Sequence, residues 1–258
     1  MLSSKTIAET WHESVVATVP PGELILITDF DGTLADVVTD PALAAARPDS
    51  LEAVRRLSEL LADVIVLSSR THTDLEQRIQ IPQARLIGDS GMAIPRHAQR
   101  QALEQFNHDA SKLLERTPGT SLETKPASSA IHFRNSELTG EEMMALIKPL
   151  LDGGRLAAAL GRKVVEVHAP RAGKGSALAA LLPAEDPAGV VCLGDDENDR
   201  SMFEYVSSLD VPHMCIGVDS PEAPMDLFGR CDLVVSGPAG AAAFLDVIVQ
   251  WASSGDAG

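Results

Sequence analysis

The chain has 258 residues, of which 45% are hydrophobic and 22% charged, the composition of an ordinary globular protein and not of a disordered or collagen-like chain. The 21 lysine and arginine residues against 37 acidic ones give a formal net charge of −16, which disfavours nucleic acid as a partner because like charges repel. No apolar run reaches the roughly 18 residues of a membrane-spanning helix and the amino terminus has no secretory pattern, so we expect a soluble, cytoplasmic protein with no membrane partner.

The first part of the chain alternates between predicted strands and helices. The apolar run at residues 24–28 predicts a buried strand, and apolar residues at helical spacing predict a helix over 49–61. A second apolar run at 64–67 predicts another strand, followed by a helix over 73–79. This alternation indicates a parallel sheet.

The middle of the chain has a different pattern. One long helix is predicted over 98–116 and a shorter one over 139–151, while segments 121–134 and 156–168 carry the period-two features of strands. Together these segments resemble an inserted α+β unit.

The strand and helix alternation returns after Pro170. The remaining predicted elements are helices over 175–182, 199–206 and 239–251 and strands over 189–193, 216–218 and 233–235. We therefore expect an α/β protein whose Rossmann-like parallel-sheet core, residues 1–94 and 170–258, receives an inserted α+β cap domain, residues 95–169. Hinges for opening and closing are expected near 91–95 and 169–173.

Polar clusters follow the first two predicted strands, and ligands of parallel sheets bind outside the carboxyl ends of strands. After the first strand, Asp29 and Asp31 are separated by one residue, and Gly32 allows a tight turn. After the second strand, Ser68 and Arg70 precede the helix predicted over 73–79. A hydroxyl, backbone N–H groups and a guanidinium could hold a phosphate oxygen there. The alternative interpretations are a solvated turn and a helix cap.

Two further clusters occur in the last third of the chain. Lys174 opens a predicted helix without the spacing of a Walker phosphate loop, so it either faces an anion or is solvated. The sequence Gly-Asp-Asp-Glu-Asn-Asp at 194–199 follows a predicted strand. So many carboxylates repel one another unless a cation is present, and hard oxygen ligands suit Mg²⁺. An acidic surface loop is the alternative.

The four clusters, taken in this order, resemble the motifs of haloacid-dehalogenase-type phosphatases. The resemblance implies that Asp29 is the nucleophile and forms an aspartyl-phosphate, and that Asp31 protonates the leaving group and then activates water. It also implies that Ser68 hydrogen-bonds the phosphoryl group and that Lys174 neutralises its charge. A dianionic phosphate approaches carboxylates only where cations offset the repulsion, which is consistent with these roles.

The same resemblance implies a Mg²⁺ cofactor. Its ligand set is Asp29, Asp31 through the backbone carbonyl, Asp195, and Asp199 in a supporting or water-mediated role.

Finer similarity points to trehalose-6-phosphate phosphatases. The matching segments are 29–41, 67–70, 86–91, 123–125, 132–134, 165–167 and 194–203. The resemblance implies these substrate-binding residues: Arg70, Glu123, Lys125, His132, Arg134 and Glu166. An exposed sheet face with cross-strand ion pairs is the alternative for those in the insert.

The leading hypothesis is a Mg²⁺-dependent phosphatase that converts trehalose 6-phosphate to trehalose and phosphate. Ser69, Phe133 and Asn198 depart from the motifs of that family at positions where substrate choice could change. A phosphatase for another glycosyl or pseudo-disaccharide phosphate, a phosphohexomutase and a catalytically idle sugar-phosphate-binding module therefore stay open. A redox protein is disfavoured, because no G-x-G-x-x-G follows the first strand. The sequence gives no indication of the oligomeric state.

Overall fold

A computed structural model describes residues 4–91, 97–126, 128–151, 155–168, 173–219, 223–224 and 226–254. The chain divides into two compact units, Met1–Gly91 with Gly173–Gly258, and Met92–Ala172. The domain boundaries expected at 94/95 and 169/170 lie outside the described residues, as do the expected hinges 91–95 and 169–173 except for Gly91 and Gly173. Among the described helices, none combines the length and the apolar character needed to cross a membrane.

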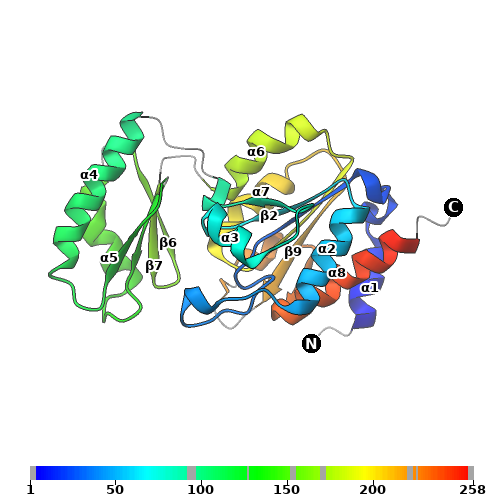
Figure 1. Cartoon of the computed structure of the whole chain (residues 1–258), viewed down its shortest axis with the longest axis horizontal. Coiled ribbons are helices and arrows are strands. Elements are labelled where there is room, and N and C mark those ends of the chain that lie inside the picture. Colours follow the sequence, from blue (N-terminus) through cyan, green and yellow to red (C-terminus); the bar gives the residue numbers. More distant parts are fainter. Residues whose placement is uncertain are drawn as a thin grey trace. The chain divides into compact units, whose positions relative to one another are not determined.

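The first unit, which carries the strands labelled β2 and β9 in Figure 1, is built on a six-stranded sheet in the order β10-β9-β8-β1-β2-β3. Its strands are β1 (Leu24–Thr28), β2 (Asp63–Leu67), β3 (Arg85–Ile87), β8 (Gly189–Gly194), β9 (His213–Asp219) and β10 (Leu233–Ser236). Every neighbouring pair is parallel. All five residues of β1 are buried, as expected for a central strand of a parallel sheet that is covered on both faces. The predicted parallel sheet is thereby confirmed.

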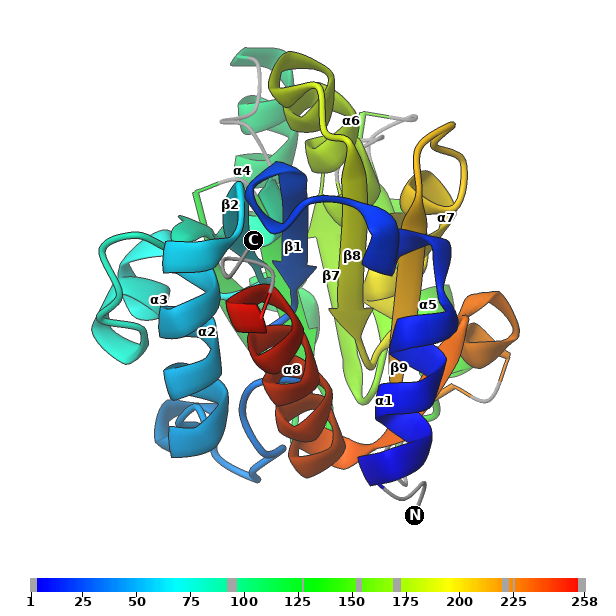
Figure 2. The same ribbon diagram turned by 90° about the vertical axis from the view of Figure 1, so that its right-hand side faces the viewer.

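Helices cover both faces of this sheet. They are α1 (Ser4–Glu13), α2 (Pro48–Leu60), α3 (His72–Arg78), α6 (Lys174–Glu185), α7 (Arg200–Val206) and α8 (Gly237–Ser254). Leu24 and Leu26 of β1 pack in a core shared with α1, α2, α3 and α8; α1, α2 and α8 lie in front of the sheet in Figure 2. Ile25 and Ile27 point to the opposite face, in a core shared with α6 and α7, because successive strand side chains alternate between faces.

The second unit has an antiparallel sheet of four strands in the order β4-β5-β7-β6. These strands are β4 (Ser121–Thr124), β5 (Ser128–His132), β6 (Ala157–Gly161) and β7 (Val164–His168), and its helices are α4 (His97–Leu114) and α5 (Gly140–Ile147). Ile131 and Val165 of the sheet form a core with Phe106 of α4 and Met143 of α5. The expected α+β insert is present, with both helices packed on one sheet face.

Some elements differ from those predicted. The helix expected over 139–151 ends at Ile147 and continues as a 3₁₀ turn, Lys148–Leu150, that contains Pro149, because proline supplies no N–H to an α-helix. The amino-terminal helix α1 was not predicted. It is anchored by Trp11, which is fully buried with its ring 5.9 Å from Phe244 and 5.1 Å from Trp251.

Candidate active site

Two aspartates follow adjacent strands at the same edge of the parallel sheet. Asp29 comes directly after β1 and Asp195 directly after β8. The backbone N–H of Asp29 donates to the carbonyl of Leu193 at 3.0 Å, which continues the pairing of the two strands. Strand register therefore brings together two residues that are far apart in sequence.

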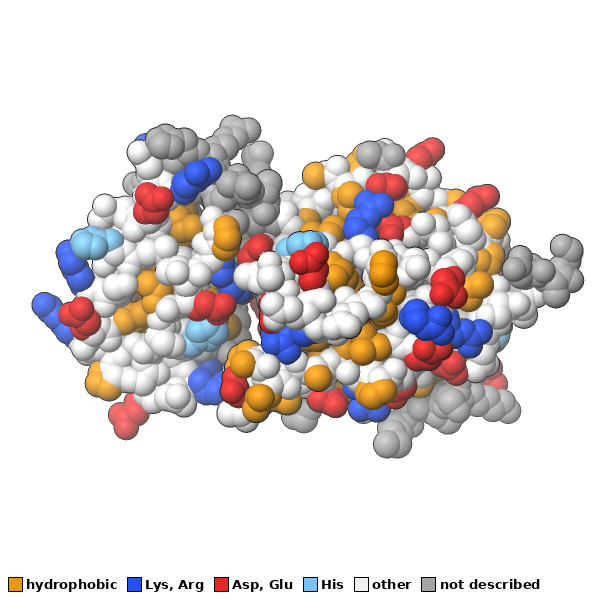
Figure 3. Space-filling view, viewed as in Figure 1, with side chains coloured by type: hydrophobic (Ala, Val, Ile, Leu, Met, Phe, Trp, Pro, Cys, Tyr) orange, Lys and Arg blue, Asp and Glu red, His pale blue; other side chains and the backbone are white. Residues whose placement is uncertain are grey.

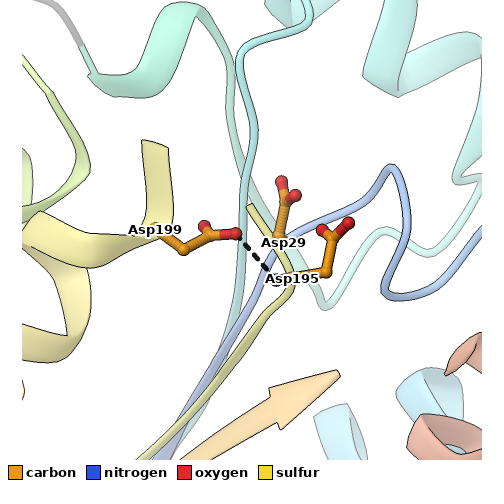
Figure 4. Close-up of side chains that lie close together, drawn as sticks. All are labelled: Asp29, Asp195 and Asp199. Carbon is orange, nitrogen blue, oxygen red and sulfur yellow. Dashed lines mark hydrogen bonds between the residues drawn. The ribbon is translucent and has the colours of Figure 1, made fainter. Parts of the chain in front are cut away.

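A third carboxylate completes a cluster. One oxygen each of Asp29, Asp195 and Asp199 lies within 4.8 Å of the others. Figure 4 shows Asp29 and Asp195 pointing the same way from neighbouring strand ends, while Asp199 approaches from the start of a helix. All three side chains are buried, so their mutual repulsion is weakly screened.

Lys174 is the cation of this cluster. Its side chain is 0% exposed, and its Nζ lies 2.7 Å from Oδ1 of Asp29 and 2.5 Å from Oδ1 of Asp199. The other oxygen of Asp199, Oδ2, accepts hydrogen bonds from the backbone N–H groups of Asp195 at 2.9 Å and Asp196 at 3.2 Å. Asp199 thus connects Lys174 to the loop that carries Asp195. The dashed line in Figure 4 marks the hydrogen bond from the backbone N–H of Asp195 to Asp199.

The electrostatics of the cluster leave it short of positive charge. Burial raises the pKa of Asp29 to about 7, against the opposing effect of Lys174. Burial, together with repulsion from Asp29 and Asp199, raises the pKa of Asp195 well above its usual value. Burial alone would lower the pKa of Lys174, but Asp199 and Asp29 outweigh it and raise that pKa, so the lysine stays charged. One lysine faces three carboxylates.

This donor set fits a divalent cation. Mg²⁺ prefers hard oxygen ligands and commonly uses only one or two protein carboxylates. Lys174 contacts Oδ1 of Asp29 and not Oδ2, and among the described residues the one hydrogen bond to the Asp195 carboxylate is a weak one from Thr33 Oγ1 at 3.4 Å. Both oxygens of Asp199 are engaged by Lys174 and by backbone N–H groups, which favours the supporting role expected of it.

The glycine of the first motif is required by the packing of this loop. Gly32 has a φ of +77°, and a Cβ built there would lie 1.9 Å from Oδ2 of Asp195. A side chain at this position would displace the carboxylate, so the close approach of the first and fourth motifs depends on glycine.

Ser68 follows β2, the strand next to β1. Its side chain is buried, its Oγ accepts the backbone N–H of Arg70 at 3.2 Å, and its carbonyl accepts the N–H of Ser90 at 2.7 Å. The hydroxyl therefore has a fixed position at the same sheet edge as Asp29.

Asp31 is held by Arg70. The arginine donates from Nε to Oδ2 at 2.6 Å and from Nη2 to Oδ1 at 2.7 Å, the bidentate geometry that planar guanidinium and carboxylate groups favour. Arg70 was predicted as a substrate-binding residue, but in the structure its fork is occupied by Asp31. A direct contact between Arg70 and substrate stays a prediction.

Several residues near this site were missed by sequence reasoning. Thr33 bonds Asp195, and Ser201 Oγ accepts the N–H of Gly175 next to Lys174 at 3.1 Å. Asp74 and Arg78 continue the contacts of Arg70. Asp74 and Arg78 alone had a sequence signal, since they are four residues apart in a predicted helix and Arg70 precedes Asp74 by four residues.

The remaining predicted residues belong to the second unit. Glu123 and Glu166 lie in one row of its sheet, because both pair with Ala130 of β5. Glu123 Oε2 lies 2.9 Å from Nε2 of His132, and Glu123 Oε1 lies 3.9 Å from Nζ of Lys125. Arg134 is exposed, two residues beyond the end of β5.

These residues share a sheet face. Strand alternation puts Glu123, His132 and Glu166 opposite Leu122, Ile131 and Val165, which pack with α4 and α5. The structure therefore groups Glu123, Lys125 and His132, and it puts Glu166 on the same face. Their predicted contacts with a sugar stay predictions.

The face drawn in Figure 3 carries acidic and basic side chains intermixed with hydrophobic ones, without a continuous basic area.

Comparisons with known proteins bear on this site. The sequence matches the trehalose-phosphatase family over residues 27–225. The trehalose-phosphate phosphatase of Mycobacterium bovis (strain BCG / Pasteur 1173P2) is 31% identical over 204 residues, covering 71% of this chain and 51% of that protein. The chain thus spans about half the length of this curated relative.

Solved structures share the fold. The C-terminal domain of C. albicans trehalose-6-phosphate phosphatase aligns with a TM-score of 0.76 at 19% identity, covering 96% of this chain and 97% of that one. A haloacid-dehalogenase-like hydrolase from B. subtilis aligns with a TM-score of 0.61 at 16% identity, covering 87% of this chain and 99% of that one. The predicted α/β fold with an inserted unit is confirmed.

Proposed function

Because the chain belongs to the trehalose-phosphatase family, we propose that it is a Mg²⁺-dependent phosphoric monoester hydrolase that converts trehalose 6-phosphate to trehalose and phosphate. The observation that carries this proposal is the fully buried Lys174, which contacts both Asp29 and Asp199 beside Asp195. A buried lysine held between two buried carboxylates gives a charged site that is ordered before substrate arrives.

Asp29 is the nucleophile in this proposal. Its carboxylate oxygen attacks phosphorus, the bond between phosphorus and the sugar oxygen breaks, and the proton of Asp31 passes to that oxygen. The products of this step are trehalose and an aspartyl-phosphate on Asp29. Lys174 holds the attacking carboxylate in place and offsets the charge of the phosphoryl group.

Hydrolysis of the intermediate restores the enzyme. Asp31, now a carboxylate, takes a proton from water as the water oxygen attacks phosphorus. The bond between phosphorus and Asp29 breaks, phosphate leaves, and Asp31 holds the proton for the next cycle. Ser68 donates a hydrogen bond to a phosphoryl oxygen in both steps.

Mg²⁺ would be held by Asp29, Asp195 and the carbonyl of Asp31, with Asp199 in support. When bound, it supplies positive charge that offsets the repulsion between a phosphate dianion and the buried carboxylates. The pKa of Asp195, raised by burial beside Asp29 and Asp199, supports a bound cation there.

We assign the sugar end of the substrate to the second unit. Glu123, Lys125, His132, Arg134 and Glu166 would hydrogen-bond sugar hydroxyls. The half-exposed pair of Glu123 and His132 supports this assignment, because carboxylate and imidazole groups accept and donate hydrogen bonds to hydroxyls.

Phosphate release tests this function. The assay compares trehalose 6-phosphate, glucose 6-phosphate, sucrose 6-phosphate, mannosyl-phosphoglycerate and an aryl phosphate, each with and without Mg²⁺. Asp29→Asn serves as the blank, and Asp246→Asn, at an exposed residue of α8, is the matched control. We expect Mg²⁺-dependent release that is fastest with trehalose 6-phosphate.

Other outcomes would select an alternative. Selectivity for another glycosyl phosphate keeps the chemistry and changes the substrate. Isomerised sugar phosphate without released phosphate indicates a phosphohexomutase. Tight binding without turnover indicates a sugar-phosphate-binding module.

A further inference from the structure

A chain of ion pairs leads from Asp31 through three further side chains. Oδ2 of Asp74 accepts a hydrogen bond from Nη1 of Arg70 at 2.7 Å and a second from Nε of Arg78 at 2.9 Å. Arg70 in turn holds both oxygens of Asp31. Charges therefore alternate from Asp31 through Arg70 and Asp74 to Arg78.

The chain ends on backbone carbonyls of the segment 41–44. Arg78 donates to the carbonyl of Ala44 through Nη1 and to the carbonyl of Ala42 through Nη2, the latter at 3.2 Å. Nη2 of Arg70 also donates to the carbonyl of Pro41 at 2.9 Å. Both arginines are therefore anchored to the segment 41–44, which contains the 3₁₀ turn Pro41–Leu43.

The arginine that touches Asp31 has little freedom left. The side chain of Arg70 is 11% exposed, its guanidinium lies over the ring of Phe30 at 5.4 Å, and all three of its nitrogens donate hydrogen bonds. Asp31 itself is more open, at 39% exposure. The position of the Asp31 carboxylate is thus set by Arg70, and that of Arg70 by Asp74.

We propose that Asp74 and Arg78 are positioning residues for the reaction, because they orient Arg70 and through it the carboxyl group of Asp31. This inference rests on the proposed function, in which Asp31 donates a proton to the leaving oxygen and later accepts one from water. When one oxygen of Asp31 carries a proton, the other oxygen still accepts a hydrogen bond from Arg70. Arg70 therefore holds the Asp31 side chain in both steps. Neither Asp74 nor Arg78 touches substrate.

The leaving group provides a selective test. A sugar oxygen is a poor leaving group and needs the proton of Asp31, whereas a nitrophenolate leaves without it. The value of kcat/KM depends only on the steps up to and including departure of the leaving group. It is therefore insensitive to the later step in which Asp31 acts as a base. A misplaced Asp31 therefore lowers kcat/KM for trehalose 6-phosphate and spares p-nitrophenyl phosphate.

The main variant is Asp74→Asn, which keeps the size of the side chain and removes its charge. We expect about a tenfold loss of kcat/KM with trehalose 6-phosphate, a part of the roughly 10²- to 10⁴-fold that general acid catalysis contributes. With p-nitrophenyl phosphate we expect less than about a threefold loss. Asp31→Asn should show the same selectivity with a larger loss.

A second variant and a control complete the test. Arg78→Lys keeps the charge beside Asp74 but lacks the planar fork that spans Asp74 and the carbonyls, so we expect a smaller loss with the same selectivity. Glu59→Gln is the matched control, because Glu59 pairs with Arg55 at the same i, i+4 spacing on the exposed face of α2. It should leave both substrates unaffected.

Equal losses with both substrates would overturn the inference, because they indicate a general structural defect. Unchanged kcat/KM with both substrates would overturn it too. Failure of the proposed function gives a different result, because the wild-type protein then turns over neither substrate. In that case both the proposed function and the positioning role are wrong.

Discussion

Lys174 and Asp29 form an ion pair of 2.7 Å in which the lysine side chain is 0% and the aspartate side chain 5% exposed. Lys174 is the first residue of α6 and Asp29 follows β1, so the pair joins a helix on one face of the sheet to the end of its central strand. Removing one partner of such a pair strongly destabilises a protein, because the remaining charge stays buried without a partner.

Lys174→Met should therefore destabilise the protein and abolish phosphate release. We expect the free energy of unfolding to fall by about 3 to 5 kcal/mol, since Asp29 and Asp199 lose their shared cation. Urea denaturation measures this loss. Lys112→Met, at an exposed position of α4, should change stability by less than about 0.5 kcal/mol, and an equally small effect at Lys174 would contradict the account.

Gly32→Ala should disrupt the contact between the first and fourth motifs. A Cβ at this position would lie 1.9 Å from Oδ2 of Asp195, and the φ of +77° is unfavourable for alanine. We expect a stability loss of about 1 to 3 kcal/mol together with strongly reduced turnover. Gly22→Ala is the control, because nothing lies within 4 Å of its Cβ position; similar behaviour of the two variants would refute the packing argument.

Mg²⁺ should stabilise the protein by relieving the repulsion among Asp29, Asp195 and Asp199. At a concentration of 100 times its dissociation constant, the expected gain is about 2.7 kcal/mol, measured as a shift of the thermal midpoint. Asp195→Asn should raise the stability of the metal-free protein, because it removes one of the repelling charges, and should abolish the gain from Mg²⁺. An undiminished Mg²⁺ effect in Asp195→Asn would show that the cation binds elsewhere.

Asp74 should contribute to stability in a pH-dependent way. Burial raises its pKa, but hydrogen bonds from Arg78 and Arg70 outweigh this effect and hold the pKa below the usual 3.8. A lowered pKa in the folded state means that the ionised form stabilises the fold, fully above the unfolded-state pKa and less as the pH falls through the folded-state value. The stability difference between wild type and Asp74→Asn should thus be largest at neutral pH and shrink below about pH 4; a difference independent of pH would exclude this role.

The sequence predicted the strands of the core well, because β1, β2 and β8 are continuous apolar runs followed by polar turns. It predicted Asp29, Ser68 and Asp195 as candidates because they follow predicted strands, and Lys174 because it opens a predicted helix. The structure adds that strand register and the start of α6 bring their positions to one edge of the sheet.

Other features depended on contacts between distant segments. Helix α1 is held by Trp11 against α8. Arg70 was assigned to substrate, since nothing in the sequence indicates that its fork meets Asp31, 39 residues earlier in the chain. The dependence of Gly32 on Asp195 is likewise a property of the folded loops alone.

The central claim is that Asp29 attacks phosphorus, and trapping the intermediate tests it most directly. The protein would be mixed with Mg²⁺ and trehalose 6-phosphate, quenched with acid during turnover, digested, and its peptides analysed by mass spectrometry. The account predicts a phosphoryl group on Asp29 that is absent from Asp29→Asn. Turnover by Asp29→Asn at a rate near that of wild type, or a phosphoryl group on another residue, would contradict it.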